Sequence, residues 1–168
     1  MREELLVAVY SKKEDVKEVV KKLMENGIDR KVISVIAKGH EEAIEKYEIE
    51  KENSDILFWG AQGAFWGAIL GALAGGIFFI VPGFGPIVGA GPIAAALAGA
   101  LGGALTGGAV FGLADALIEW GLDEIEAKKL EDLVRKGKYL LLVHADEKIV
   151  NKAKEILDET KAEEIEIL

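Results

Sequence analysis

The feature that most constrains this chain is a long stretch without charge between Asp55 and Asp115. No Asp, Glu, Lys, Arg or His occurs there, although 29% of the whole chain is charged. About 20 apolar helical residues span the roughly 30 Å hydrocarbon core of a bilayer, and the stretch holds two such lengths. We therefore predict a transmembrane helical hairpin over residues 56–114. The turn falls at residues 82–86, which include Pro82, Gly83, Gly85 and Pro86.

Small residues recur at every fourth position in both arms of this predicted hairpin. The two rows are Gly63, Gly67, Gly71 and Gly75 in the first arm, and Ala95, Gly99, Gly103 and Gly107 in the second. In a helix such rows form a smooth groove, and small-xxx-small patterns of this kind associate helices in lipid. Each glycine costs a helix roughly 1 kcal/mol relative to Ala, which close packing against a partner would offset. We therefore expect this glycine zipper to drive homo-oligomerisation.

Two tryptophans indicate how the hairpin meets the membrane. Trp59 begins the first arm and Trp120 follows the second, so both mark the same end. Amphipathic indoles favour the headgroup level, and we expect this end at the cytoplasmic interface. The N-terminus lacks the basic start of a signal peptide, which agrees with cytoplasmic chain ends. An alternative stays open, because helices that are apolar all round are also buried in soluble assemblies.

Composition narrows the classes of partner and chemistry. The net charge of −9 argues against nucleic acid, whose phosphates would be repelled. The absence of Cys excludes disulfides and thiolate catalysis. Many Glu, Lys and Ile residues with few Asn and Gln favour a thermophilic source.

The first 40 residues predict half of an α/β domain. Residues 5–10 and 31–38 are apolar runs of strand length, and helical spacing of apolar residues lies between them. Ser11 and Glu14 have capping-box spacing at the start of that helix. Gly27 supplies its stop. This βαβ unit leads into a charged connector, residues 41–55, which we expect to be helical.

Residues 115–168 predict a connecting helix and the second half of that domain. Asp123 begins a helix that Gly137 ends, with Ile125 and Leu130 expected on its apolar face. A strand at 138–145, a helix capped by Asp146 and an alternating strand at 163–168 follow. The two halves together predict a ferredoxin-like α+β sandwich, βαβ plus βαβ, with the apolar Gly/Ala-rich helical hairpin inserted between them.

This organisation resembles a known family. The strand–helix–strand start and the glycine-zipper insert precede a segment running from Glu126-Ala127-Lys128-Lys129-Leu130 to Gly137, which leads into Leu141-Leu142-Val143. The pattern is similar to the heat-induced or general stress protein family, a small α/β domain interrupted by a glycine-rich segment. The resemblance implies a stress-related, membrane-associated protein and carries over no catalytic residues.

The chain offers few groups for catalysis or metal binding. His40 beside Glu41 and Glu42 has metal-ligand chemistry, but a surface loop histidine is the favoured interpretation because metal sites need several convergent ligands. His144 is interpreted as a satisfied histidine at the edge of the sheet, near a strand end. Ser34 has no His and acid partners in phase, as a nucleophilic triad requires. We therefore expect no catalytic residues, metal or cofactor.

The glycine runs of the second arm also lack the chemistry of a phosphate-binding loop. No Lys follows Gly102-Gly103 or Gly107-Gly108, whereas a P-loop ends in Gly-Lys-Ser/Thr. The leading hypothesis is therefore a non-enzymatic membrane scaffold that oligomerises through its hairpin under stress. One alternative is a small oligomeric pore gated by the cytoplasmic domain, with Gln62 and Thr106 as its main polar lining. The other is a soluble homo-oligomeric particle that buries the hairpins.

Overall fold

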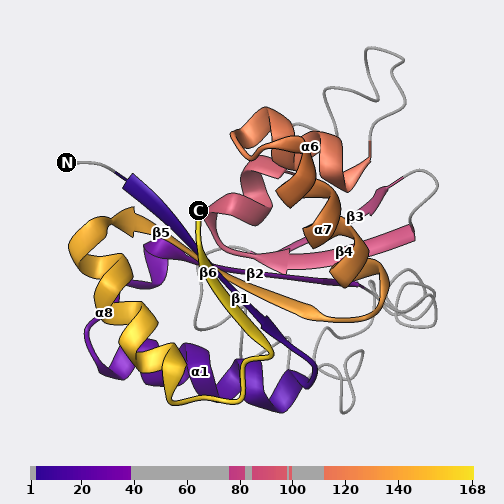
Figure 1. Ribbon diagram of the computed structural model, residues 1–168. Coiled ribbons are helices and arrows are strands. Elements are labelled where there is room, and N and C mark those ends of the chain that lie inside the picture. The colour runs from indigo at the N-terminus through magenta and orange to yellow at the C-terminus, as the bar shows by residue number, and fades with distance from the viewer. Residues whose placement is uncertain (1–2, 39–75, 82–84, 98, 100–111) are drawn as a thin grey trace.

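A computed structural model describes residues 3–38, 76–81, 85–97, 99 and 112–168 of the chain (Figure 1). These residues form one antiparallel sheet with the strand order β3-β4-β2-β5-β1-β6. The strands are β1 (Glu3–Tyr10), β2 (Ile33–Lys38), β3 (Gly76–Val81), β4 (Gly85–Ala90), β5 (Tyr139–Asp146) and β6 (Glu164–Ile167). The chain is thus a mixed α/β protein.

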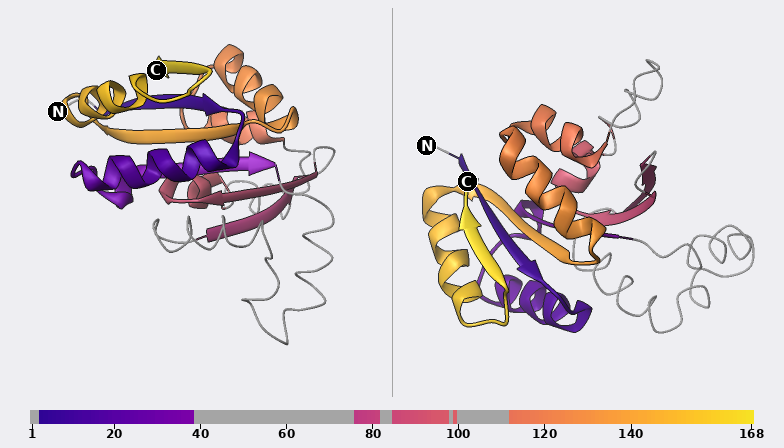
Figure 2. Two further views of the ribbon diagram at one scale, coloured as in Figure 1. Left: turned by 90° about the horizontal axis from the view of Figure 1, so that it is seen from below. Right: turned by 45° about the vertical axis from the view of Figure 1, so that its right-hand side comes forward.

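Helices cover both faces of the sheet (Figures 1 and 2). The elements are α1 (Lys13–Glu25), η1 (Arg30–Val32), α6 (Leu113–Trp120), α7 (Glu124–Arg135) and α8 (Glu147–Asp158), with a further helical segment at residues 92–97. One core cluster packs α1 and α8 on the first face. The second cluster packs residues 92–97, α6 and α7 on the opposite face. Because β1, β2 and β5 contribute to both clusters, their apolar runs are buried on both sides.

The N-terminal elements follow the predicted order, with one error in the cap of α1. The helix buries Val16, Val20 and Leu23 along one stripe and is followed by Gly27 at φ +87°. Its N-cap is Lys12, and no side chain caps it. The predicted capping box is therefore wrong, because the helix begins one residue later than a Ser11 cap requires.

The caps of α7 and α8 are confirmed. Asp123 accepts a hydrogen bond from the Glu126 backbone N–H at 2.8 Å, and Asp146 accepts one from Ile149 at 2.9 Å. The apolar stripe of α7 differs from the prediction, since Ile125 is 81% exposed. Its buried positions are Ala127, Leu130 and Val134.

The middle of the uncharged stretch forms strands, so the helical prediction for residues 76–81 and 87–90 is wrong. Gly85 and Pro86, predicted in the hairpin turn, begin β4. This strand pairs with β2 from Lys38↔Ile87 to Val35↔Ala90 and with β3 along its whole length. The physical reason is that the run Ile-Phe-Phe-Ile-Val in β3 is of β-branched and aromatic types, which favour a pleated strand. The β3–β4 pair joins the sheet through hydrogen bonding of β4 to the edge of β2.

The later described parts of the stretch pack into the domain as well. Ile93, Leu97, Leu113 and Ala114 are all buried in the second core cluster. The connector at 41–55, most of the first arm and residues 100–111 lie outside the described residues. In the described ranges, no helix combines the length and apolarity that a membrane crossing needs.

Candidate functional site

Most residues of the predicted glycine zipper lie outside the described part of the chain, as do Trp59 and two residues of the predicted turn. These residues are Gly63, Gly67, Gly71, Gly75, Gly103, Gly107, Trp59, Pro82 and Gly83. Their oligomerisation, interface and turn roles stay predictions. Gly99 is described, and it is helical and exposed. A Cβ added there would meet nothing within 4 Å, so no described residue packs closely against it.

Trp120, the predicted interface residue, ends α6 and packs against the domain. Its ring contacts His144 edge-on, with ring centroids 5.0 Å apart and an interplanar angle of 71°. The imidazole Nε2 of His144 also lies 3.4 Å from the carboxylate Oε2 of Glu3. His144 is therefore a partnered histidine, as interpreted from the sequence, although β5 lies inside the sheet between β1 and β2.

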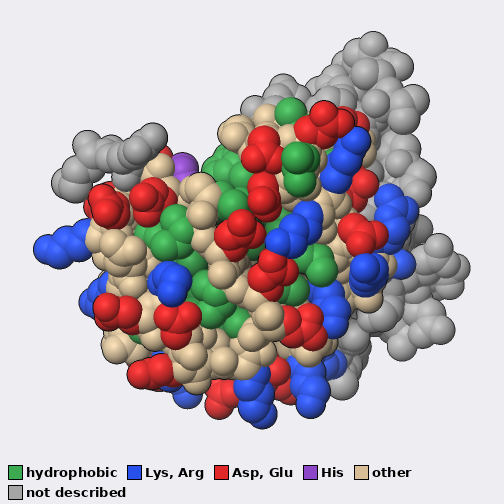
Figure 3. Space-filling model, in the orientation of Figure 1, with side chains coloured by type: hydrophobic (Ala, Val, Ile, Leu, Met, Phe, Trp, Pro, Cys, Tyr) green, Lys and Arg blue, Asp and Glu red, His purple; other side chains and the backbone are tan. Residues whose placement is uncertain are grey.

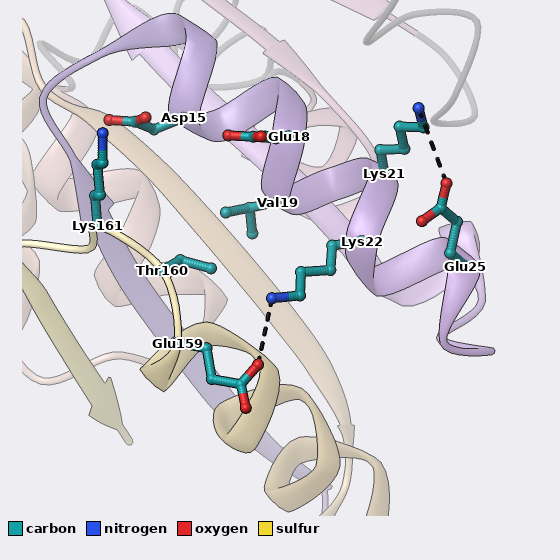
Figure 4. A pocket seen from close by; sticks show the side chains of 9 residues that line it. All are labelled: Asp15, Glu18, Val19, Lys21, Lys22, Glu25, Glu159, Thr160 and Lys161. Atoms are coloured by element: carbon teal, nitrogen blue, oxygen red, sulfur yellow. Dashed lines mark hydrogen bonds and ion pairs between the residues drawn. The ribbon is translucent and has the colours of Figure 1, made fainter.

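A groove of about 510 Å³ lies between α1 and the turn that follows α8 (Figure 4). It is lined by Asp15, Glu18, Val19, Lys21, Lys22, Glu25, Glu159, Thr160 and Lys161. The ion pair between Lys22 and Glu159, 3.3 Å long, crosses the groove. A second pair joins Lys21 to Glu25 within α1 at 3.9 Å. The groove therefore lies between two elements that are distant in sequence, and the Lys22–Glu159 ion pair connects them.

A tyrosine lies beneath this groove. Tyr10 is fully buried, and its hydroxyl lies 2.8 Å from Thr160 Oγ1. Thr160 donates its own hydroxyl proton to the carbonyl of Leu157, so Tyr10 is the donor in the first bond. Burial raises the pKa of Tyr10, and the negative charge of Asp15 adds to the rise. The Tyr10 hydroxyl proton thus takes part in a hydrogen bond to Thr160 that stabilises the fold.

The groove has the chemistry of a polar contact surface. Its four carboxylates and three ammonium groups are interleaved, and its lining contains no His, Cys or Ser. Charges of both signs also alternate over the face seen in Figure 3. Across the described ranges, no group of three or more His, Asp or Glu side chains could hold a metal ion. The groove provides no nucleophile–base pair, and it suits contact with a mixed-charge surface.

Sequence patterns suggest only a nucleophilic role for Ser34, and that role lacks partners. In the structure Ser34 is instead a hydrogen-bond acceptor inside the core. Ser34 is fully buried on β2, and its Oγ accepts a hydrogen bond from the Ile93 backbone N–H at 3.0 Å. Ile93 is the second residue of the helical segment 92–97. The hydroxyl therefore satisfies one of the N–H groups that a helix leaves without a partner at its start.

Two glycines outside the predicted zipper rows make this junction possible. Gly91 has φ +101°, and an added Cβ would lie 2.3 Å from the carbonyl oxygen of Ile33. A Cβ on Gly89 would lie 2.8 Å from Cβ of Ala94. Gly91 followed by Pro92 at the first helical position is a signal for a turn and then a helix, and the sequence-based prediction missed it.

Comparison with protein-family models, with curated proteins and with solved structures finds no match to this chain.

Proposed function

We propose that this protein is a non-enzymatic, self-associating scaffold whose α/β domain holds an uncharged segment against a lipid bilayer from one side. One observation carries the proposal. The chain leaves the sheet at Lys38 of β2 and re-enters it at Gly76 of β3, on the two sides of β4. Lys38 pairs with Ile87 and Gly76 with Ala90, three residues further along β4. Residues 39–75 are therefore one connection with both ends in one sheet.

This connection contains residues 56–75, which are uncharged and carry half of the predicted glycine zipper. A single crossing would place its two ends on opposite sides of a hydrocarbon core roughly 30 Å thick. Both flanks belong to one sheet, and residues 41–55 are too rich in charge to supply a return crossing. The topology therefore supports attachment from one side, with apolar surface entering the bilayer interface, over a transmembrane arrangement.

The domain supports the ferredoxin-like interpretation. The order β2-β5-β1-β6, antiparallel throughout, with α1 and α8 packed on one face, is the arrangement expected of two interleaved βαβ units. In this interpretation β3 and β4 extend the ferredoxin-like core at one edge. With the resemblance to heat-induced or general stress proteins, this supports a stress-related role for the scaffold.

A soluble homo-oligomer is the second candidate. It is favoured by the burial of Ile87, Ile93 and Leu113, which shows that parts of the uncharged stretch pack against protein. Residues 56–75 would then be covered by another copy. A pore with two long helical arms is not carried forward, because residues 76–81 and 85–90 are strands.

Liposome flotation combined with light scattering tests the proposal. The wild-type protein should float with liposomes and give an oligomeric mass, and Gly67→Leu should reduce both because a leucine fills the predicted groove. Lys17→Leu is the matched control, since it adds the same side chain at an exposed site on α1. An oligomer that does not float would favour the soluble assembly. A monomer that stays with the soluble fraction would contradict both candidates.

A further inference from the structure

The two edges of the sheet differ in how well they are protected. The edge strand β6 has four residues and includes Glu164 and Glu166. Lys129 of α7 forms ion pairs with both carboxylates, the second at 3.5 Å. Short edge strands with charged side chains resist pairing with another chain. The β6 edge is therefore guarded.

The opposite edge strand, β3, is longer than β6 and carries no charged side chain. Its six residues, Gly-Ile-Phe-Phe-Ile-Val, include no charge and no proline. Within the described residues β4 is the strand that pairs with it, and no strand occupies its outer side (Figure 2). In an antiparallel edge strand alternate residues direct N–H and C=O groups away from the sheet. An apolar, uncharged edge of this length is a template for strand addition.

We propose that β3 pairs antiparallel with β3 of a second copy, joining the two sheets across a twofold axis. The inference rests on the proposed self-association and names its interface. An isologous contact needs a self-complementary surface, and an uncharged strand of apolar residues pairs with itself without placing like charges opposite each other.

The charge distribution favours a second copy as the partner at this edge. The chain carries a net charge of −9, so two copies repel each other over much of their surface. β3 lies inside the stretch that contains no charge, where two copies can approach without that repulsion. Pairing through β6 would instead bring Glu164 and Glu166 of both copies together. Because β3 is uncharged whereas β6 is protected by charge, pairing through β3 closes at a dimer and does not propagate as a filament.

Cysteine scanning tests this interface directly, because the natural chain contains no Cys. The single variants are Ile77→Cys, Phe78→Cys, Phe79→Cys and Ile80→Cys, with Ile165→Cys on β6 as the matched control. Opposed residues of antiparallel strands have Cα atoms about 4.5–5.5 Å apart, within the range that a disulfide spans. Only residues at the twofold axis face their own copy. Oxidation should therefore crosslink strongly at one or two adjacent β3 positions.

Light scattering of the reduced proteins separates the outcomes. The proposal predicts a dimer mass, crosslinks confined to one or two β3 positions and no crosslink at Ile165→Cys. An oligomer in which no β3 cysteine crosslinks would overturn this interface while leaving self-association intact. Equal crosslinking at every position, including β6, would overturn it as random collision. A monomer at all concentrations would overturn both the interface and the self-association beneath it.

Discussion

Ser34 and Ile93 are 59 residues apart in sequence, and the side chain of the first accepts the backbone N–H of the second at 3.0 Å in the protein interior. Ser34 lies on β2, and Ile93 belongs to the uncharged stretch that β4 connects to the sheet. The bond therefore joins that stretch to the α/β domain.

Ser34→Ala should lower the free energy of unfolding by about 1–3 kcal/mol, because it leaves a buried N–H without an acceptor. The control is Ser11→Ala, which removes an exposed hydroxyl that caps no helix. Its effect should stay within about 0.5 kcal/mol. Urea denaturation measures both, and equal losses in the two variants would contradict the role given to Ser34.

Gly91→Ala should destabilise the fold by at least about 3 kcal/mol, since it combines a positive φ with a clash against the Ile33 carbonyl. Gly137→Ala is the matched control, with φ +90° and no heavy atom within 4 Å of the added Cβ. It should cost about 1–2 kcal/mol for the left-handed backbone alone. A loss at Gly91 no larger than that at Gly137 would show that the close junction is absent.

The start of α6 depends on a carboxylate from α7. Glu131 Oε2 accepts a hydrogen bond from the Ala114 backbone N–H at 2.7 Å. Glu131→Ala should cost about 1–2 kcal/mol, and Glu131→Gln less because its amide oxygen can still accept. Asp132→Ala, which removes an exposed carboxylate paired with Lys136, should cost at most about 1 kcal/mol. Thermal unfolding ranks the three, and a Gln variant as unstable as the Ala variant would argue against the cap.

Stability should fall at alkaline pH, partly through Tyr10. Burial raises the pKa of Tyr10 above its ordinary value of 10.0, so the folded state holds this proton after the unfolded chain has lost it. The contribution is complete below about pH 10 and is lost as pH rises through the folded pKa. Burial raises the pKa of Tyr139 in the same direction, so some decline remains in any single variant.

The pH prediction is checked by the free energy of unfolding of wild type and Tyr10→Phe, measured from about pH 8 to 12. The variant should be less stable at neutral pH, because the bond to Thr160 is lost, and should decline less steeply above about pH 10. Parallel curves for the two proteins would mean that Tyr10 ionises alike in both states.

Local sequence signals predicted the N-terminal and C-terminal parts of the fold well. Apolar periodicity located α1, α7 and α8, and Asp123 and Asp146 marked helix starts correctly. These signals work because a cap or an amphipathic face depends on residues within a few positions of each other. Ile125 shows the limit, since a residue at the helix start can share the stripe's spacing and still project beyond the core.

The middle of the chain was mispredicted because its signals are ambiguous. Without charge or polar alternation, an apolar run cannot be assigned to helix or strand by periodicity. The strand β4 depends on pairing with β2, whose residues lie about 50 positions earlier in the chain, and β3 in turn pairs with β4. The hydrogen bond of Ser34 could not be predicted either, because its donor, Ile93, belongs to a segment far away in the sequence. Long-range contacts of this kind are not encoded in local spacing.

The most direct test of the account is to ask by NMR whether residues 85–90 pair with β2. Nuclear Overhauser contacts should connect Val35 with Ala90 and Ala37 with Val88 across the antiparallel ladder. Chemical shifts of residues 76–81 and 85–90 should be those of strands, in buffer and with lipid alike. Helical shifts and sequential helical contacts over both ranges, without any contact to β2, would contradict the account and restore the membrane hairpin.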